Sequence, residues 1–332
     1  MREPRFWWDG PGIISALLSP FGALYGSAAA SRMRREGQRA GVPVICIGNF
    51  TLGGTGKTPA AIAVAELLKH EGRRPALLTR GYGGSVIGPA VVDPQRHTAA
   101  DVGDEALLLA HAATTIMSRD RIAGAQAAVV QGADVIVMDD GLQNPSLAKD
   151  LTIALVDARR GIGNGNVFPA GPLRAPLDVQ LDQCHSVLIV GDGSKAAPIA
   201  TKAQQRGLVV FHGELQPDDA AITALSARPV LAFAGIGDPD KFFATLRAAG
   251  ADVKATRAFP DHHRFSAEQA GELIMQAEHD GLRLVTTAKD HARMSADPAL
   301  SALAERAYVL PVTMKVKETE AWRGLLLAAL RR

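Results

Sequence analysis

The sequence predicts an α/β fold, a three-layer sandwich with a mostly parallel sheet, followed by a second, smaller α/β unit. Short apolar runs typical of buried strands alternate with helix-like segments along the first two thirds of the chain, at residues 44–47, 75–79, 135–138, 153–156, 187–190 and 208–211. After Pro229 the pattern restarts with a strand, a glycine turn and a helix. Hydrophobic residues make up 47% of the chain and aromatic residues only 5%, which is typical of an Ala-, Val- and Leu-rich α/β protein.

The length of 332 residues is enough for two domains. We expect an apolar and basic segment at 1–40, a first α/β domain at 41–226 and a smaller α/β domain at 227–332 that closes over the site. The formal net charge of +2 gives no global field that favours nucleic acid. Cys46 and Cys184 stand far apart in strand-like segments, so no disulfide framework is indicated and a reducing cytoplasm is the default compartment.

A glycine-rich loop follows the first strand, in the sequence GNFTLGGTGKT, and a helix at 60–68 comes after it. Backbone N–H groups in such a loop, together with the N-terminus of a helix, bind phosphate. Lys57 can reach the β- and γ-phosphates, and the Thr58 hydroxyl is placed to ligate Mg²⁺. The usual P-loop pattern has glycine where Thr51 stands. The phosphate-binding residues predicted here are Thr51, Leu52, Gly53, Gly54, Thr55, Gly56, Lys57 and Thr58.

This order of strand, loop and helix predicts a site for a nucleoside triphosphate. A tight turn that needs glycines, followed by an ordinary surface lysine, is the alternative interpretation.

Polar residues at the ends of later strands are expected on the same side of the sheet, because ligands bind beyond the carboxyl ends of parallel strands. Arg80 and Tyr82 follow the strand at 75–79, although Arg80 could equally be a surface charge. Asp104 and Glu105 open a helix, either as caps that complement the helix dipole or as catalytic groups. Arg121, near Arg119, is a phosphate clamp or a solvated charge.

The run VIVMDDG is the second strong signal, because an apolar strand that ends in aspartate can hold Mg²⁺ opposite the Thr58 hydroxyl. Asp139 is assigned to the metal and Asp140 to the support of a loop or of the substrate. A turn at the end of a strand is the alternative. The glycine- and proline-rich segment that follows the strand at 153–156 contains Arg174 and suggests a lid or binding loop.

The segment from Gly10 to Ser31 contains no charged residue, and arginines follow it. A spanning helix and a cleaved signal peptide are possible interpretations, but prolines and glycines weaken the first and a nucleotide site disfavours export. A helix pair in the membrane interface, with Trp7 and Trp8 at headgroup depth, is favoured over a buried N-terminal helix.

Seven motifs in one order resemble the tetraacyldisaccharide 4′-kinase family of lipid A biosynthesis, and the resemblance runs from the N-terminal apolar segment to near Lys289. They are GNFTLGGTGKTP, TRGYGG, DVGDEA, VIVMDDGLQN, FPAGPLRAP, FPDHHRF and TTAKD. Two positions depart from the family pattern. Asn144 stands where a histidine is usual, and Ala175 stands where an acid is usual.

The resemblance implies a peripheral enzyme on the cytoplasmic face of the bacterial inner membrane. It would transfer the γ-phosphate of ATP to the 4′-hydroxyl of an acylated glucosamine disaccharide 1-phosphate. Asp104 would be the catalytic carboxylate with His262 as its partner, and Lys57 would act on the phosphates. We expect Mg²⁺ at Thr58, Asp139 and Glu105. Substrate contacts are expected from Arg80, Tyr82, Asp140, Gln143, Arg121 and Arg174.

Two other classes of protein share the glycine loop. A GTP-driven switch or metallochaperone should carry an Asn/Thr-Lys-x-Asp guanine reader, but in the nearest sequence, Thr287-Ala-Lys289-Asp290, the lysine directly precedes the aspartate. A membrane-binding ATPase of the partitioning type would not explain Asp104 or His262. Without the resemblance, His262 and His263 are ordinary surface histidines and weak metal ligands. No nucleic acid and no obligate protein partner are expected.

Overall fold

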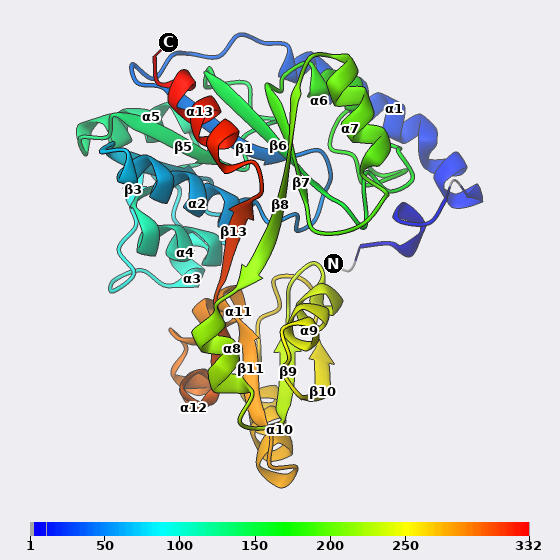
Figure 1. Ribbon diagram of the computed structural model, residues 1–332. Helices are drawn as coiled ribbons and strands as arrows, with labels where there is room; N and C mark the ends of the chain where they lie inside the picture. The colour runs from blue at the N-terminus through cyan, green and yellow to red at the C-terminus, as the bar shows by residue number, and fades with distance from the viewer. Residues whose placement is uncertain (1–2, 11, 332) are drawn as a thin grey trace.

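The computed structural model describes residues 3–10 and 12–331, which form two α/β units joined by two strands (Figure 1). In these residues the larger unit has a nine-stranded sheet and the smaller unit a four-stranded sheet. The spatial order of the large sheet is β13 (Val312–Val316), β8 (Val209–Pro217), β7 (Ser186–Val190), β6 (Leu151–Asp157), β1 (Val44–Asn49), β5 (Val135–Asp139), β2 (Pro75–Thr79), β4 (Thr114–Met117) and β3 (Ala90–Val91).

Helices cover both faces of the large sheet, and alternate residues of β1 point to opposite layers. Ile45 and Ile47 pack with α2 (Lys57–His70), α4 (Asp104–Ala112) and α13 (Thr319–Ala329). Val44 and Cys46 pack with α5 (Arg121–Val130), and α1 (Ile13–Met33), α6 (Leu177–Leu181) and α7 (Ala197–Gln205) extend that layer. Burial on both faces explains why the central strands are continuously apolar. The predicted three-layer α/β architecture is confirmed.

The strand order places several carboxyl ends beside the glycine loop. β1 lies between β5 and β6 and runs parallel to both, with Ile47 in register with Asp139 and Asn49 in register with Leu155. β2 is parallel to β5 on its other side. The ends of four strands therefore meet at one edge, where ligands of open α/β sheets bind.

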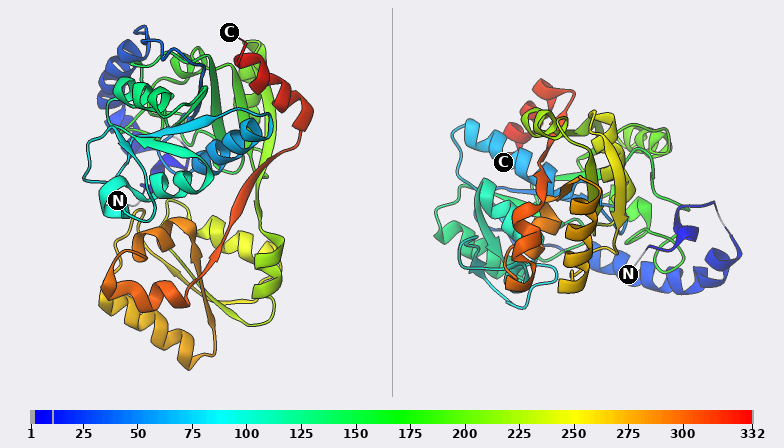
Figure 2. Two further views of the ribbon diagram at one scale, coloured as in Figure 1. Left: turned by 90° about the vertical axis from the view of Figure 1, so that its left-hand side faces the viewer. Right: turned by 90° about the horizontal axis from the view of Figure 1, so that it is seen from below.

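The smaller unit has a parallel sheet in the order β10 (Val253–Ala258), β9 (Val230–Ala234), β11 (Arg283–Thr287) and β12 (Tyr308–Leu310). Its helical segments are α8 (Asp219–Leu225), α9 (Pro239–Ala248), α10 (Ala267–His279), α11 (Ala288–Met294), η2 (Pro298–Leu300) and α12 (Ser301–Arg306). The short helix α3 (Ala99–Val102) lies in the large unit, before α4. The two units come together at the edge that carries the glycine loop (Figure 2).

The boundaries of the smaller unit differ from those expected at residues 227 and 332. Ala221 and Leu225 of α8 pack in its core, so the unit begins near residue 218. Met314 of β13 and Trp322 of α13 instead belong to the core of the large unit. β13 returns antiparallel to β8, and Figure 2 shows it crossing between the units. Pro229 therefore lies inside the smaller unit, and composition alone did not reveal the returning strand.

The N-terminal segment forms a short 3-10 helix, η1 (Arg5–Trp7), and one long helix, α1, where a helix pair was expected. Pro20 lies inside α1 and leaves the Ala16 carbonyl without its usual backbone donor, but the Ser19 hydroxyl donates to that carbonyl at 2.9 Å. Gly22 lets the helix approach the Val167 carbonyl, since a Cβ there would lie 2.8 Å from that oxygen. One face of α1 is thus closely packed on the large unit.

Candidate active site

The glycine loop turns between β1 and α2, and its last residue, Gly56, has a φ of 88°, a left-handed conformation that favours glycine. Thr51, which occupies the place of the usual first glycine, is buried and forms a β-bridge with Leu173. Its carbonyl accepts a hydrogen bond from Nε of Arg174 at 3.0 Å. Side-chain bulk at Thr51 is accommodated because the loop at 166–176 pairs with this strand-like part of the glycine loop.

Two distant segments lie against the tip of the glycine loop. A Cβ on Gly53 would lie 2.1 Å from Oε1 of Glu3, and a Cβ on Gly237 would lie 3.4 Å from the backbone nitrogen of Gly54. Glu3 is held there by Arg160, whose Nη1 donates to Oε2 at 2.8 Å. The N-terminal segment and the smaller unit therefore both contact the phosphate-binding loop.

Lys57, Asp140 and Arg174 form a compact charged cluster at the ends of β1 and β5. Nη1 of Arg174 donates to both oxygens of Asp140, at 2.8 and 3.0 Å, and Nζ of Lys57 lies 3.8 Å from Oδ1. Burial alone would raise the pKa of Asp140, but Lys57 and Arg174 hold it below its usual range. Burial lowers the pKa of Lys57, opposed by Asp140. The cluster aims two cations at the place where an anionic ligand would meet the loop.

Asp139 differs sharply from its neighbour. It is fully buried, and neither carboxylate oxygen has a hydrogen-bond partner among the residues that the structure describes. Burial raises its pKa to about 7, and the negative charges of Glu105 and Asp140 add to the effect. A buried carboxylate without partners is costly, and such a group is typical of a site whose partner is a cation.

Asp104 stands at the start of α4 and meets the smaller unit. Its Oδ2 accepts from Nε of Arg293 at 2.8 Å and lies 3.7 Å from Nδ1 of His262. Burial alone would raise the pKa of Asp104, but His262, Lys289 and Arg293 hold it below the usual range. Asp104 in turn raises the pKa of His262. The structure thus brings together the two residues that the resemblance pairs.

The His262 side chain is held by backbone and ring contacts. Its φ of 54° is unusual for a residue other than glycine, and its ring centroid lies 5.0 Å from that of Tyr82.

Glu105, beside Asp104, accepts from Nζ of Lys289 at 2.6 Å. Glu105, expected at the metal, is therefore already paired across the boundary between the units.

A second set of ion pairs joins the units on the other side of the glycine loop. Nζ of Lys241 in α9 lies 2.5 Å from Oδ2 of Asp157, at the end of β6. Nη2 of Arg160 lies 3.1 Å from Oδ2 of Asp238, at the start of α9. The loop is therefore flanked by charged contacts between the units on both sides.

The other predicted substrate residues occupy different environments. Arg121 is buried, and its Nη1 donates to the Ser118 carbonyl at 3.0 Å, so it is not a solvated charge. Nε2 of Gln143 donates to the Asn49 carbonyl at 2.8 Å. Arg80 is exposed at the end of β2 and makes no ion pair within the described part of the chain. These residues lie at the same sheet edge, but two of them are engaged by the protein itself.

Three residues at the site were not singled out from the sequence: Glu3, Lys289 and Arg293. The last two belong to or follow the motif TTAKD, whose first two residues end β11, so Lys289 and Arg293 come just after the end of a strand. That position was the available signal. Nothing in the sequence indicates that Glu3 reaches the glycine loop.

The parallel strand order around β1, together with the loop at its carboxyl end, places the chain in the class of P-loop nucleotide-binding proteins. Within that class, the particular family follows from sequence comparison. The chain belongs to the tetraacyldisaccharide-1-P 4′-kinase family, whose sequence model matches residues 14–331.

Full-length relatives and a solved structure agree with this. A tetraacyldisaccharide 4′-kinase of Methylobacterium sp. (strain 4-46) is 57% identical, covering 100% of this chain and 98% of the relative. One from Rhodopseudomonas palustris (strain BisA53) is 50% identical, covering 99% and 96%. The crystal structure of the "apo" form of LpxK from Aquifex aeolicus in complex with ATP covers 96% of this chain and 100% of that chain. Its TM-score is 0.73 at 24% sequence identity, and it has the same fold.

Proposed function

We propose that this protein transfers the γ-phosphate of ATP to the 4′-hydroxyl of a tetraacylated glucosamine disaccharide 1-phosphate and so forms the 1,4′-bisphosphate. Membership of the kinase family supports this activity. The observation that carries it is the pair of Asp104 and His262, which adds a means of activating a hydroxyl to the nucleotide site.

For the nucleotide, we assign the phosphates to the backbone N–H groups of the glycine loop and to Lys57. The residues present also fit Mg²⁺. Asp139 offers two buried oxygens without partners, and Thr58 offers a hydroxyl in the first turn of α2. The described residues contain no group of three or more His, Cys, Asp or Glu side chains that could hold a metal, so phosphate oxygens and water would complete the shell. Bound Mg²⁺ neutralises charge on the transferring phosphoryl group.

For the acceptor, we assign Asp104 as the group that receives the hydroxyl proton. Its Oδ1 accepts the backbone N–H of Glu105 at 2.9 Å and retains a further lone pair. Because phosphoryl transfer requires little covalent chemistry from the protein, the main role of such a carboxylate is to align the hydroxyl with the γ-phosphate. His262 would orient the carboxylate and share the proton. Arg80, Tyr82 and Arg174 are the substrate contacts that face this sheet edge.

The direct test uses γ-labelled ATP, tetraacyldisaccharide 1-phosphate in mixed micelles, and Lys57→Met as the inactive control. We expect labelled lipid with the native protein and none with the control. The same lipid already phosphorylated at the 4′ position should accept no label. Hydrolysis of ATP without labelled lipid would contradict the proposal and favour the membrane-ATPase alternative.

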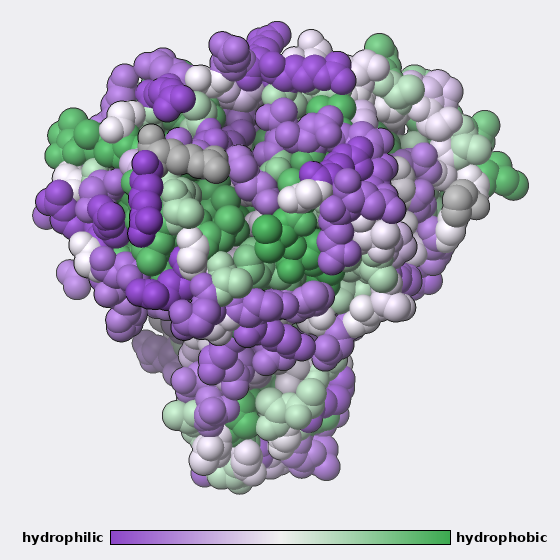
Figure 3. Space-filling model, turned by 45° about the horizontal axis from the view of Figure 1, so that its top comes forward, coloured by the Kyte–Doolittle hydropathy of each residue, from purple (hydrophilic) through white to green (hydrophobic). Residues whose placement is uncertain are grey.

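A lipid acceptor requires access to the bilayer, and we assign this role to α1. By length and composition this helix could cross a membrane, and only 28% of its most apolar 18-residue stretch is buried in the protein. The side chains on its outer face are large, apolar and exposed: Ile13, Ile14, Leu17, Phe21, Leu24 and Tyr25. Hydrophobic residues appear at the upper right tip of the molecule in Figure 3, among more polar ones, on the side where α1 lies in Figure 1. We propose that this face lies in the headgroup region on the cytoplasmic side of the inner membrane.

Replacing Leu17 and Leu24 with aspartate is expected to reduce sedimentation with vesicles of phosphatidylglycerol and phosphatidylcholine at least about tenfold, because two exposed apolar anchors are lost. These side chains are 72% and 74% exposed, so folding should be unaffected. Val130→Asp is the matched control, since Val130 is 82% exposed but lies on α5. Equal vesicle binding by all variants would contradict the assignment of α1.

A further inference from the structure

Arg293 of α11 contacts more of the site than any role in packing requires. Its side chain is 9% exposed, and its Nε donates to Oδ2 of Asp104 at 2.8 Å. Its Nη1 lies within hydrogen-bonding distance of three acceptors: the carbonyls of Gly235 at 2.9 Å and His263 at 3.2 Å, and Oδ1 of Asp290 at 3.1 Å. One guanidinium thus links the large unit to three segments of the smaller unit.

Each of these segments has a task at the site. Gly235 begins the turn whose Gly237 lies against Gly54 of the glycine loop. His263 directly follows His262, so its carbonyl fixes the backbone that presents the imidazole. Asp290 also accepts the backbone N–H of Gly235 at 3.0 Å. Arg293 is therefore the common anchor of the turn that meets the P-loop and of the segment that carries His262.

The Asp104 carboxylate is held at both oxygens. Oδ1 accepts the backbone N–H of Glu105, and Oδ2 accepts Nε of Arg293. The first contact lies within the large unit, and the second comes from the smaller unit. The orientation of this carboxylate relative to His262 therefore depends on the hydrogen bond that the smaller unit supplies through Arg293.

We propose that Arg293 is a positioning residue for phosphoryl transfer, which fixes the Asp104 carboxylate and the His262 backbone in one geometry across the boundary between the units. This inference rests on the proposed function of Asp104. The planar fork of arginine is needed, because a lysine ammonium cannot reach Asp104 and the three acceptors of Nη1 at once. Nη2 of Arg293 is buried and has no hydrogen-bond partner among the described residues. The guanidinium is therefore oriented by the contacts of Nε and Nη1, and not by pairing of every donor.

The first experiment compares Arg293→Met and Arg293→Lys with the native protein. Because a displacement of about 1 Å can cost about 10²-fold in rate, we expect kcat to fall 10- to 100-fold in Arg293→Met. KM for ATP and for the lipid should change less than about threefold, since neither is bound by Arg293. Arg293→Lys keeps the charge and should recover part of kcat. An unchanged kcat in a folded Arg293→Met protein would overturn the proposal.

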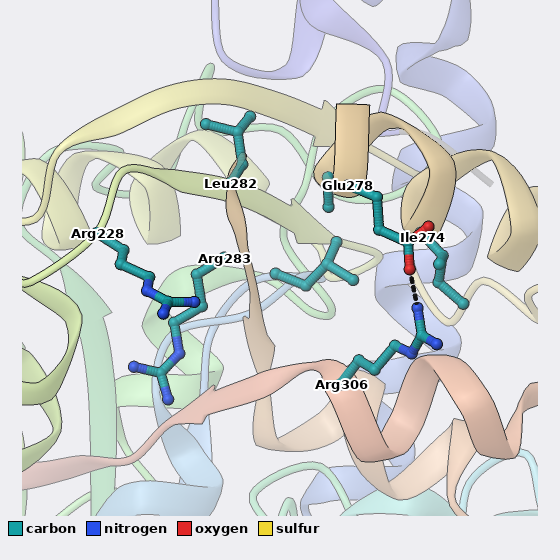
Figure 4. A pocket seen from close by; sticks show the side chains of 8 residues that line it. Arg228, Ile274, Glu278, Leu282, Arg283 and Arg306 are labelled. Carbon is teal, nitrogen blue, oxygen red and sulfur yellow. Dashed lines mark hydrogen bonds and ion pairs between the residues drawn. The ribbon is translucent and has the colours of Figure 1, made fainter. Parts of the chain in front are cut away.

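Arg306→Met provides the matched control within the same unit. Arg306 lies in α12, its side chain is 52% exposed, and it pairs with Glu278 at a cavity of about 570 Å³ (Figure 4). Arg228 and Arg283 line that cavity at the amino ends of β9 and β11, opposite the carboxyl ends that face the site. The Arg306→Met substitution removes an arginine ion pair but leaves the site intact, so kcat should be unchanged. A similar fall of kcat in both variants would assign the effect to general destabilisation and contradict positioning.

A double-mutant cycle separates positioning from stability. If Arg293 acts through Asp104, then Arg293→Met should lower kcat less than about threefold in an Asp104→Ala background. Additive losses would show that Arg293 acts elsewhere and would overturn the inference. The failure of the proposed function has a different signature, because Asp104→Ala would then retain full lipid phosphorylation whatever stands at position 293.

Discussion

Replacing Asp104 with alanine is expected to lower kcat for lipid phosphorylation by about 10²- to 10⁴-fold, the usual contribution of a positioned general base. The carboxylate is aligned by both units, through the backbone N–H of Glu105 in the large unit and Nε of Arg293 in the smaller unit. KM for ATP should change little, because the phosphates are assigned to the glycine loop and Lys57. The measurement is initial-rate kinetics with labelled ATP in mixed micelles.

Asp104→Asn is the companion variant, because it keeps the shape of the side chain and one acceptor for Arg293. Both variants should lose activity, because neither has a carboxylate that can receive the hydroxyl proton. Only alanine leaves the buried Nε of Arg293 without its partner, so only Asp104→Ala should also lower the unfolding midpoint. Equal loss of activity at different stability would separate the catalytic role from the structural one. An asparagine variant that turns over at the native rate would remove Asp104 from the mechanism.

Replacing Asp139 with asparagine is expected to lower kcat by about 10³-fold, comparable to the loss of one strong electrostatic contact to the transition state. Its two oxygens are the buried, unpartnered acceptors that we assign to Mg²⁺. Asp134→Asn is the matched control, since Asp134 lies just before the other end of the same strand and its Oδ1 accepts the Arg74 backbone N–H, which an asparagine oxygen can also accept. The rates are measured over a range of Mg²⁺ concentrations.

The Asp139→Asn substitution should raise the stability of the folded protein although it lowers activity. In the folded protein the pKa of Asp139 is raised to about 7 by burial, whereas the usual value is 3.8. Between these two values the folded state binds more protons than the unfolded state, so the charged carboxylate costs progressively more stability as pH rises, with the full cost present above about pH 7. In EDTA, the Asp139→Asn substitution should therefore raise the unfolding midpoint above that of the native protein by more at pH 8 than at pH 5. A difference independent of pH would contradict a raised pKa.

Most of the secondary structure could be predicted because the strands are buried on both faces and read as apolar runs. The runs at 44–47, 75–79 and 187–190 correspond to β1, β2 and β7. Site residues that end or follow such strands, including Asp139 and Lys57, could be identified for the same reason, since parallel order brings strand ends together. Asp104 and His262 could be assigned only through the family resemblance. In sequence, a catalytic aspartate looks the same as an aspartate that caps a helix, and a catalytic histidine looks the same as a surface histidine.

Contacts between distant segments that the family resemblance did not imply could not be predicted. Arg293 and Asp104 are 189 residues apart, and no local pattern distinguishes an arginine in α11 that reaches a carboxylate from one that faces water. Glu3 lies against Gly53 because α1 is anchored on the loop at 166–176, an arrangement set by packing of the whole unit. The same is true of α13, whose amphipathic sequence would fit either sheet.

The return of the chain through β13 has a consequence for biosynthesis. On the ribosome, the P-loop strand β1 and helix α2 emerge early, but Trp322 and Leu326, which share their core, emerge only after the whole smaller unit has been made. The smaller unit can finish folding during translation, while the part of the nucleotide-binding sheet that α13 covers stays exposed to solvent until α13 arrives. A nonsense mutation between β12 and α13 would therefore spare the inserted unit and leave the enzyme's own nucleotide-binding unit unfinished.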